Sequence, residues 1–353
     1  MTWRNAPFVT VCAVAFSAPA IAQNAVRETV FYMTGGDAAF DSFRDHVDQI
    51  DVIGPQVYAV EGDGVVWGAV DPRVLSLAKQ ASVKVMPLIH NPGFNQESIH
   101  TLLADSAARA RTIASMVQLG REFGYWGWQF DFENVHVSDT DRFTAFYREA
   151  AEALHAAGMT LSVAVVPTDG RPGHLPFHRY MLANWRGNFD VAALAEAGDF
   201  ISLMTYAQHG GVTTPGPIAG LPWMRRMVQY ALDQGVPAAK ISLGIPSYSG
   251  YWRPDYTASQ GAKAAGAEVS WSRARALLDQ NQVEATWLPD QGSHLAYWER
   301  SGTFEWLFLE DHRSFATKLA LLDEFPGLRG ISVWVLGAED PDIWPLLGER
   351  RRR

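Results

Sequence analysis

Short apolar, β-branched segments alternate with amphipathic segments along most of the chain, and this alternation limits the possible folds more than any other feature. Strand–helix alternation favours parallel strands, and eight repeats predict an α/β fold, a closed (β/α)8 TIM barrel whose site lies at the carboxyl ends of the strands. The eight expected strands are Thr29–Thr34, Val52–Val60, Val83–Ile89, Trp126–Glu133, Leu161–Val166, Phe200–Tyr206, Ile241–Tyr248 and Gly330–Leu336. The expected helices are Phe40–Gln49, Arg73–Gln80, Leu102–Phe123, Asp139–Ala157, Val191–Ala197 and Met224–Gln234.

A doubly wound open sheet is the alternative fold. It would need a glycine-rich phosphate loop directly after the first strand. The segment Thr34-Gly35-Gly36-Asp37 does not have that spacing. The closed barrel is therefore the preferred interpretation.

One interval interrupts the alternation, because the seventh strand ends near Tyr248 and the eighth begins near Gly330. We expect a small α+β insertion at about residues 250–311, within one barrel of residues 23–353. Ser301-Gly302 has the composition of a hairpin turn inside it. The expected elements of the insertion are a helix at Ser272–Gln280 and strands at Val283–Leu288, His294–Glu299 and Phe304–Leu309.

Residues 1–22 have the pattern of a signal peptide. Arg4 is the positive residue, Phe8–Phe16 is an apolar stretch too short to span a bilayer, and Ala20-Ile21-Ala22 fits a cleavage site. The only cysteine, Cys12, lies in this segment. We therefore expect a periplasmic or secreted protein without disulfides or a membrane anchor, and we expect it to be a monomer.

The net charge of −9, from 38 acidic and 29 basic residues, disfavours a nucleic-acid-binding surface. No metal site and no nucleotide-binding motif is apparent, because the one histidine pair with helical spacing, His174 and His178, lies in a stretch with the composition of a loop. We expect no metal and no other cofactor.

The fourth expected strand carries the most informative pattern in the sequence. Because alternate side chains of a strand share a face, three polar residues point into the barrel and three aromatic residues point toward the helices. The polar row is Gln129, Asp131 and Glu133; the aromatic row is Trp128, Phe130 and Phe132.

Glu133 is the last residue of the polar row and reaches the mouth of the barrel, while Asp131 lies one layer deeper. Desolvation and the like charge of Asp131 raise the pKa of Glu133, as a general acid requires. We also expect the Gln129 amide to donate a hydrogen bond to the Asp131 carboxylate.

This segment resembles the strand-four signature of glycoside hydrolase family 18, D-G-x-D-x-D-x-E, in which the Glu is the proton donor. Gly127, Asp131 and Glu133 match the signature, whereas Trp126 and Gln129 stand where the family has Asp. The ending D-F-E-N is most similar to the branch that contains spore-cortex-lytic enzymes, in which an amide often replaces the outer Asp.

The resemblance extends along nearly the whole chain after residue 22. Ala207, which follows one of the matching segments, stands where an Asp is common in the family. The other matching segments are Leu203–Tyr206, Gly216–Ala219, Pro222-Trp223, Lys240–Pro246, Phe308–Asp311 with Ser314 and Lys318, and Gly330–Trp334.

The resemblance implies a retaining, substrate-assisted hydrolase that cleaves β-1,4-linked N-acetylglucosamine glycans such as peptidoglycan or chitin oligosaccharides. Glu133 would protonate the glycosidic oxygen, Asp131 would orient the 2-acetamido group of the sugar, and Tyr206 would hydrogen-bond the acetamido oxygen. Trp334 would form the floor beneath the sugar ring.

Three further residues are candidates for substrate binding. Tyr32 and Tyr58 point into the barrel if their strands are regular, and Gln208 follows Tyr206 at the mouth. A catalytically silent, lectin-like member of the same fold is the alternative, which Gln129 and Ala207 leave open. The presence of Glu133 favours the enzyme.

Overall fold

A computed structural model describes residues 26–211, 213–255 and 263–351 of the chain. The expected signal peptide at residues 1–22, with Cys12, lies outside the described residues. Within them, no helix is both long and apolar enough to cross a bilayer.

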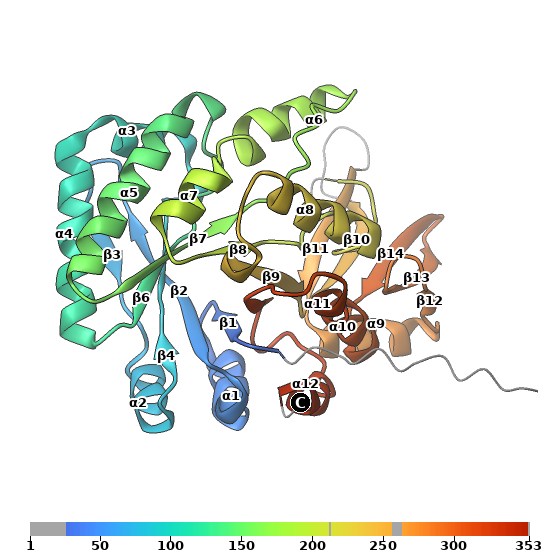
Figure 1. Cartoon of the computed structure of the whole chain (residues 1–353). Helices are drawn as coiled ribbons and strands as arrows, with labels where there is room; N and C mark the ends of the chain where they lie inside the picture. The colour runs from blue at the N-terminus through green and yellow to red at the C-terminus, as the bar shows by residue number, and fades with distance from the viewer. Residues whose placement is uncertain (1–25, 212, 256–262, 352–353) are drawn as a thin grey trace, which may run out of the picture.

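Eight parallel strands close into a barrel, which confirms the expected fold (Figure 1). Closure is complete because β1 is hydrogen-bonded to both β2 and β15. In order around the barrel the strands are β1 (Thr29–Met33), β2 (Val52–Val60), β5 (Leu88–His90), β6 (Gly127–Phe130), β7 (Thr160–Val165), β8 (Phe200–Leu203), β9 (Ile241–Pro246) and β15 (Gly330–Trp334). Two short strands, β3 (Val66–Gly68) and β4 (Lys84–Val85), also pair with β2.

Helices surround the barrel between the strands. The α-helices of the barrel are α1 (Asp37–Asp45), α2 (Pro72–Ala81), α3 (Gln96–Ala104), α4 (Ser106–Phe123), α5 (Thr140–Ala156), α6 (Pro176–Met181), α7 (Val191–Ala197), α8 (Leu221–Asp233), α10 (His312–Leu319), α11 (Leu321–Glu324) and α12 (Ile343–Arg351). Shorter helical turns are η1 (Val47–Gln49), η2 (Pro92–Phe94), η3 (Val137–Asp139), η4 (Leu182–Arg186) and η5 (Ala238–Lys240).

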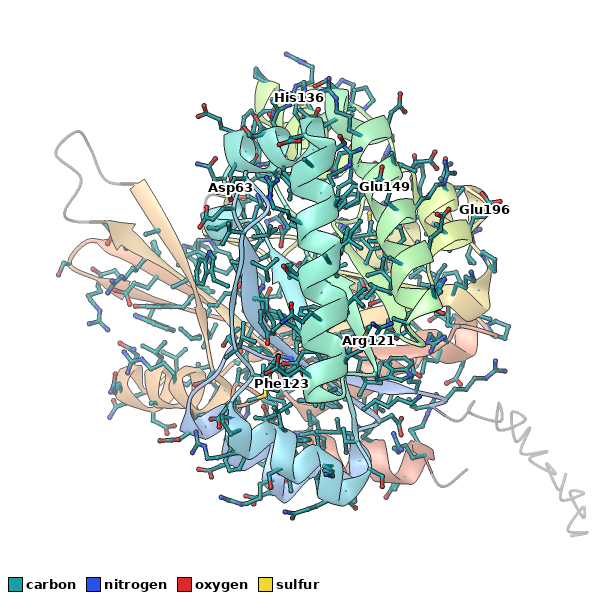
Figure 2. The ribbon with its side chains drawn as sticks, turned by 90° about the vertical axis from the view of Figure 1, so that its left-hand side faces the viewer. Asp63, Arg121, Phe123, His136, Glu149 and Glu196 are labelled. Carbon is teal, nitrogen blue, oxygen red and sulfur yellow. The ribbon has the colours of Figure 1, made fainter. Side chains whose placement is uncertain are left out.

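The single helix expected at residues 102–123 is in fact two helices, α3 and α4. Asp105 between them has an extended backbone (φ −102°, ψ 107°), and its carboxylate accepts a hydrogen bond from the Ala107 amide. This side-chain cap begins a new helix, and the helical periodicity alone does not reveal it. Figure 2 shows α4 and α5 side by side on the outside of the barrel, where Arg109 binds Glu149 through hydrogen bonds of 2.9 and 3.0 Å.

The aromatic row of β6 packs outward, as the alternation predicts. Phe130 and Phe132 are fully buried, with ring centroids 4.9 Å apart. Both rings contact Phe143 and Phe146 of α5. Burying these rings against the helix fixes the opposite, polar row toward the inside of the barrel.

The insertion forms a second sheet beside the barrel, at the right of Figure 1. Its strand order is β11-β10-β14-β13-β12, and all pairings are antiparallel. The expected hairpin is confirmed, with Ser301 and Gly302 at its turn in positive-φ conformations. The elements are β10 (Ser249–Asp255), β11 (Lys263–Val269), α9 (Trp271–Asn281), β12 (Thr286–Leu288), β13 (Ser293–Arg300) and β14 (Thr303–Leu309).

Candidate active site

A cavity of about 640 Å³ opens where the barrel strands end. This size is typical of a site for a small molecule or a few sugar units. Its walls come from the loops after the strands, from the α6–η4 segment and from the edge strand β11 of the insertion. Among its lining residues are Tyr32, Gln56, Gln129, Asp131, Glu133, Tyr180, Trp185, Arg186, Met204, Tyr206, Trp223, Tyr248, Glu268 and Trp334.

Glu133 and Asp131 lie just beyond β6, because this strand ends at Phe130 and is shorter than expected. Asn91, fully buried in the loop after β5, holds the Glu133 backbone. Its amide oxygen accepts from the Glu133 N–H at 3.2 Å, and its amide nitrogen donates to the Glu133 carbonyl at 3.0 Å. Asn134 then reverses the chain with a φ of 54°, a conformation that asparagine tolerates well. The backbone of the D-F-E-N ending therefore positions the Glu133 side chain in the cavity.

The charge of Asp131 acts on the Glu133 carboxyl group. Desolvation, followed by the charges of Asp131 and Glu268, raises the pKa of Glu133 to about 8. The pKa of Asp131 is also raised, mainly by its burial, although a hydrogen bond of 2.7 Å from the Gln56 amide favours its charged form. Glu133 therefore holds a proton at neutral pH, as the sequence predicts for a general acid.

Gln129 lies beneath Asp131, fully buried, and does not make the expected hydrogen bond to it. Its amide oxygen instead lies 3.0 Å from the Tyr32 hydroxyl and 3.1 Å from the Ser162 hydroxyl. Its amide nitrogen has no partner among the described residues. The amide that donates to Asp131 belongs to Gln56. The prediction of a hydrogen bond from Gln129 to Asp131 is therefore wrong.

Tyr206 and Trp334 line the cavity together. Their ring centroids are 6.5 Å apart with an interplanar angle of 22°. Trp334 also contacts Tyr32, at 5.9 Å between centroids. The Tyr206 hydroxyl has no hydrogen-bond partner in the described part of the chain, so it is available to a ligand in the cavity.

Two sequence-predicted binding residues lie elsewhere. Tyr58 points outward, because a β-bulge between Gln56 and Tyr58 reverses the alternation of β2. Its hydroxyl is buried 2.8 Å from the Tyr125 hydroxyl. The Gln208 side chain does not line the cavity, since its amide oxygen accepts from the Gly220 amide at 2.8 Å and joins the two ends of a loop.

Gln56, Glu268 and Arg186 are among the cavity residues that were not sequence-predicted candidates. Gln56 shares the parity of Tyr32 across the paired strands, so the pattern that suggested Tyr58 also pointed to Gln56. Glu268 lies at the exposed mouth of the cavity on β11, and Arg186 lies at the end of η4. Neither Glu268 nor Arg186 lies beside a recognisable end of a barrel strand in the sequence, so the sequence pattern did not indicate that they line the cavity.

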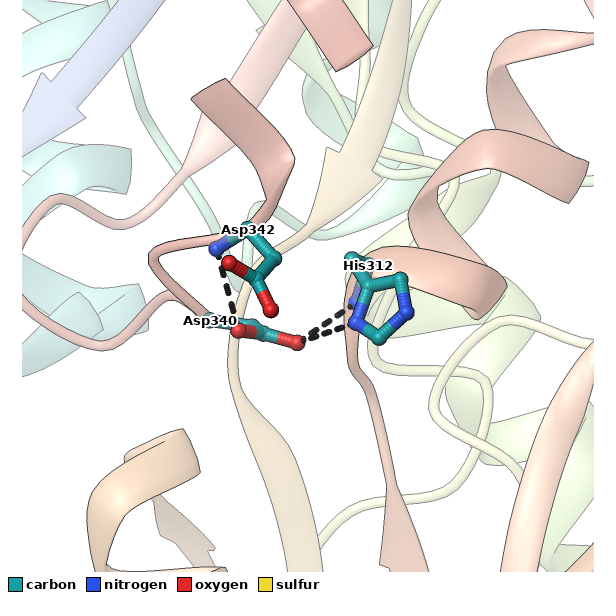
Figure 3. A group of neighbouring side chains, drawn as sticks. All are labelled: His312, Asp340 and Asp342. Carbon is teal, nitrogen blue, oxygen red and sulfur yellow. Dashed lines mark hydrogen bonds and ion pairs between the residues drawn. The ribbon is translucent and has the colours of Figure 1, made fainter. Parts of the chain in front are cut away.

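A group able to ligate a metal lies outside this cavity. One ligand atom from each of His312, Asp340 and Asp342 falls within 4.8 Å of the others (Figure 3). The Asp340 carboxylate already accepts from the His312 amide at 2.9 Å and from the Asp342 amide at 3.1 Å, and it lies 2.8 Å from His312 Nδ1. The group thereby ties the start of α10 to the loop before α12.

Comparison with protein families gives one match that spans most of the chain. The model described as "Glycosyl hydrolases family 18" matches residues 70–339. These residues include β6, the three catalytic candidates Asp131, Glu133 and Tyr206, and the whole insertion.

Individual relatives are similar over most of the chain. The uncharacterized glycosylase YvbX of Bacillus subtilis is 24% identical over 322 residues, which cover 90% of this chain and 89% of that protein. The cortical fragment-lytic enzyme of the same organism is 29% identical over 279 residues, 78% of this chain. The match spans only 62% of that enzyme's length.

Solved structures support the same fold. A chitinase from Chromobacterium violaceum superimposes with a TM-score of 0.81, covering 93% of this chain and 99% of the other at 24% identity.

Proposed function

The chain belongs to family 18 of the glycosyl hydrolases and is a glycosidase, and from this premise we propose that it cleaves β-1,4-linked N-acetylglucosamine glycans by a retaining, substrate-assisted mechanism. The observation that carries the proposal is the pair Asp131 and Glu133 in the lining of the cavity, with the pKa of Glu133 raised, mainly by desolvation, to about 8. A protonated carboxyl is the group that a glycosidic oxygen needs when its bond breaks.

In the first step, Glu133 donates its proton to the leaving oxygen while the acetamido oxygen of the substrate attacks the anomeric carbon. The carbon–oxygen bond to the leaving sugar breaks, and a cyclic oxazolinium forms. In the second step, the Glu133 carboxylate removes a proton from water, which opens the oxazolinium from the same face as the departed sugar. The anomeric configuration is therefore retained.

Asp131 and Tyr206 orient the internal nucleophile in this proposal. The Asp131 carboxylate accepts the acetamido N–H and stabilises the positive charge that develops. The free Tyr206 hydroxyl donates to the acetamido oxygen, and Trp334 supports the apolar face of the sugar. Holding the acetamido group in line replaces a bimolecular encounter with an intramolecular step.

A silent, sugar-binding member of the fold is the second candidate. Gln129 and Ala207, each of which stands where the family commonly has Asp, are the departures that favour it. The retained Glu133 and its raised pKa favour the enzyme.

We also propose that residues 1–22 direct export, so that the enzyme works in a periplasm or outside the cell, and that it acts as a monomer. Protease protection in spheroplasts and N-terminal sequencing of the purified protein test export. Light scattering tests the oligomeric state.

The decisive experiment is mass spectrometry of the products from purified peptidoglycan sacculi and from chitohexaose. We expect hydrolysis by the wild type and none by Glu133→Gln, an isosteric change that removes only the acid. Proton NMR of the first product should show the β-anomer. A Glu133→Gln variant that keeps most of its activity would refute the acid–base role, and a wild type that binds both glycans without cleaving them would favour the lectin.

A further inference from the structure

Arg186 is a cation without a counter-charge in the wall of the cavity. It is the last residue of η4, and its neighbours Trp185 and Tyr180 line the same wall. It also borders a second hollow, on the other side of Val166 and Pro167. Its Nε atom is buried and has no hydrogen-bond partner among the described residues.

No acidic side chain in the described part of the chain forms an ion pair with Arg186. The one acid that acts on it is Asp169, whose carboxylate already binds Arg171 through a hydrogen bond of 2.8 Å and lies 4.0 Å from Arg226. Among the described arginines whose pKa is shifted, Arg186 is the one whose pKa is lowered, because burial outweighs the attraction of Asp169. The others have theirs raised by a neighbouring acid.

Burying a guanidinium without a partner destabilises a fold, so a protein seldom keeps one that has no ligand. The planar fork of arginine matches a carboxylate with two parallel hydrogen bonds. A partly dehydrated guanidinium in a substrate cavity is therefore prepared for an anion.

Different acids act on the two sides of the cavity chemistry: Asp131 and Glu268 act on Glu133, whereas the acid that acts on Arg186 is Asp169. An anion on the reacting sugar would be repelled by the Asp131 carboxylate, so the anion for which Arg186 is suited belongs on a neighbouring sugar in the same cavity. The cavity thus distinguishes the two positions by charge.

We propose that Arg186 binds a carboxylate carried by a sugar next to the one that reacts, so that the enzyme prefers an acidic N-acetylated glycan to a neutral one. This inference rests on the proposed function and narrows its substrate. The carboxylate is either the lactyl group of a muramic acid unit or an acidic group on a peptide attached to it. Chitin carries neither.

The test compares kcat/KM on four probes. They are chitohexaose, peptidoglycan strands freed of peptides so that the lactyl carboxylates are exposed, the same strands with those carboxylates converted to methylamides, and strands that keep their peptides. We expect the wild type to prefer one of the two acidic probes to the methylamide by about tenfold, the effect of one charge-assisted contact. The preferred probe identifies which carboxylate is bound.

Arg186→Gln should lose about tenfold on the preferred acidic probe and stay within about twofold of the wild type on chitohexaose. Arg179→Gln is the matched control, because Arg179 is an exposed arginine of the same segment that does not line the cavity. The melting temperature of Arg186→Gln should not fall, since no partner within the protein is lost. An equal loss on chitohexaose, an unchanged preference for the acidic probe, or a marked loss of thermal stability would each overturn the proposal.

Binding separates this inference from the proposed function. In a Glu133→Gln background, calorimetry should show that Arg186→Gln weakens binding of the acidic strands by about tenfold. If the wild type cleaves no probe but this Arg186 effect on binding is present, the hydrolytic function fails and the anion site stands. If cleavage occurs and binding is independent of Arg186, the anion site fails and the hydrolytic function stands.

Discussion

At the scale of single residues, Glu268 of the insertion influences the acid–base chemistry in the barrel. The Glu268 charge is one of the causes that raise the pKa of Glu133, after desolvation and Asp131. Since the first step needs Glu133 protonated, the alkaline limb of kcat/KM follows this pKa. Glu268→Gln removes a negative charge, stabilises the Glu133 carboxylate and lowers its pKa.

We therefore expect the alkaline limb of the Glu268→Gln variant to move to lower pH by a few tenths of a unit to about one unit, with activity at pH 5 nearly unchanged. Rate profiles between pH 4 and pH 10 measure the shift. Glu284→Gln is the control, because Glu284 is an exposed acid of the same insertion that does not act on Glu133. An alkaline limb that moves upward, or that moves equally in both variants, would contradict the assignment.

Gln129 supports a second prediction at this scale. Gln129→Asp would place a carboxylate beneath Asp131 and would remove the acceptor now used by Tyr32 and Ser162. Two neighbouring carboxyl groups share a proton, so the charged form of Asp131 becomes harder to reach. The acidic limb of kcat/KM should therefore move to higher pH than in the wild type. Superimposable acidic limbs would show that residue 129 does not influence Asp131.

Asp131 and Glu133 could be predicted from the sequence because they form a row with a clear parity on one strand, whereas the role of Tyr206 was implied by the resemblance to the family. It also predicted the raised pKa of Glu133 from burial and a like charge, which the structure supports. It assigned the wrong amide to Asp131, because an alternating pattern gives the face of a side chain but not its partner across the barrel. Arg186 could not be predicted, since only the folded loop shows that its charge is unpaired.

At the scale of secondary-structure elements, a bulge in β2 turns Tyr58 away from the cavity. The bulge between Gln56 and Tyr58 sends Tyr58 into the helix layer, where it meets Tyr125 and Trp128. A sequence pattern that assumes a regular strand cannot include it. The strands β10 and β11 were missed for another reason: β11 is rich in alanine and β10 contains glycine, proline and aspartate, all of low strand propensity, so pairing within the sheet determines their structure.

Because of the bulge, we expect substitutions of Tyr58 and Tyr32 to have different effects. Tyr58→Phe leaves the buried Tyr125 hydroxyl without its partner, which should cost about 1–2 kcal/mol of unfolding free energy while kcat/KM stays unchanged. Tyr32→Phe should lower kcat/KM, because Tyr32 lines the cavity and contacts Gln129. Urea unfolding and steady-state kinetics of both variants check this. A Tyr58→Phe variant with a lowered kcat/KM would contradict this prediction and would indicate that Tyr58 takes part in the site.

At the scale of the whole molecule, a buried ion pair joins the insertion to the barrel. Lys318 of α10 and Glu310 after β14 have side chains that are 0% and 2% exposed. The Lys318 ammonium donates to Glu310 and, at 2.8 Å, to the Gly292 carbonyl before β13. Glu310 and Lys318 also belong to one of the further segments that resemble the family, and their ion pair gives a physical reason for that pattern.

Because the pair spans both parts, we expect the insertion and the barrel to unfold together in the wild type. Lys318→Met leaves the Glu310 carboxyl buried without its cation and should cost about 3–5 kcal/mol. The matched control is Arg225→Met, which breaks an exposed pair with Glu324 and should cost less than about 1 kcal/mol. The unfolding transitions followed by tryptophan fluorescence and by far-UV circular dichroism in urea should coincide for the wild type and separate for Lys318→Met.

Adding Glu310→Leu to Lys318→Met should recover much of the lost stability, since the uncompensated carboxyl is then gone. Equal losses in Lys318→Met and Arg225→Met would mean that the buried pair does not hold the insertion to the barrel.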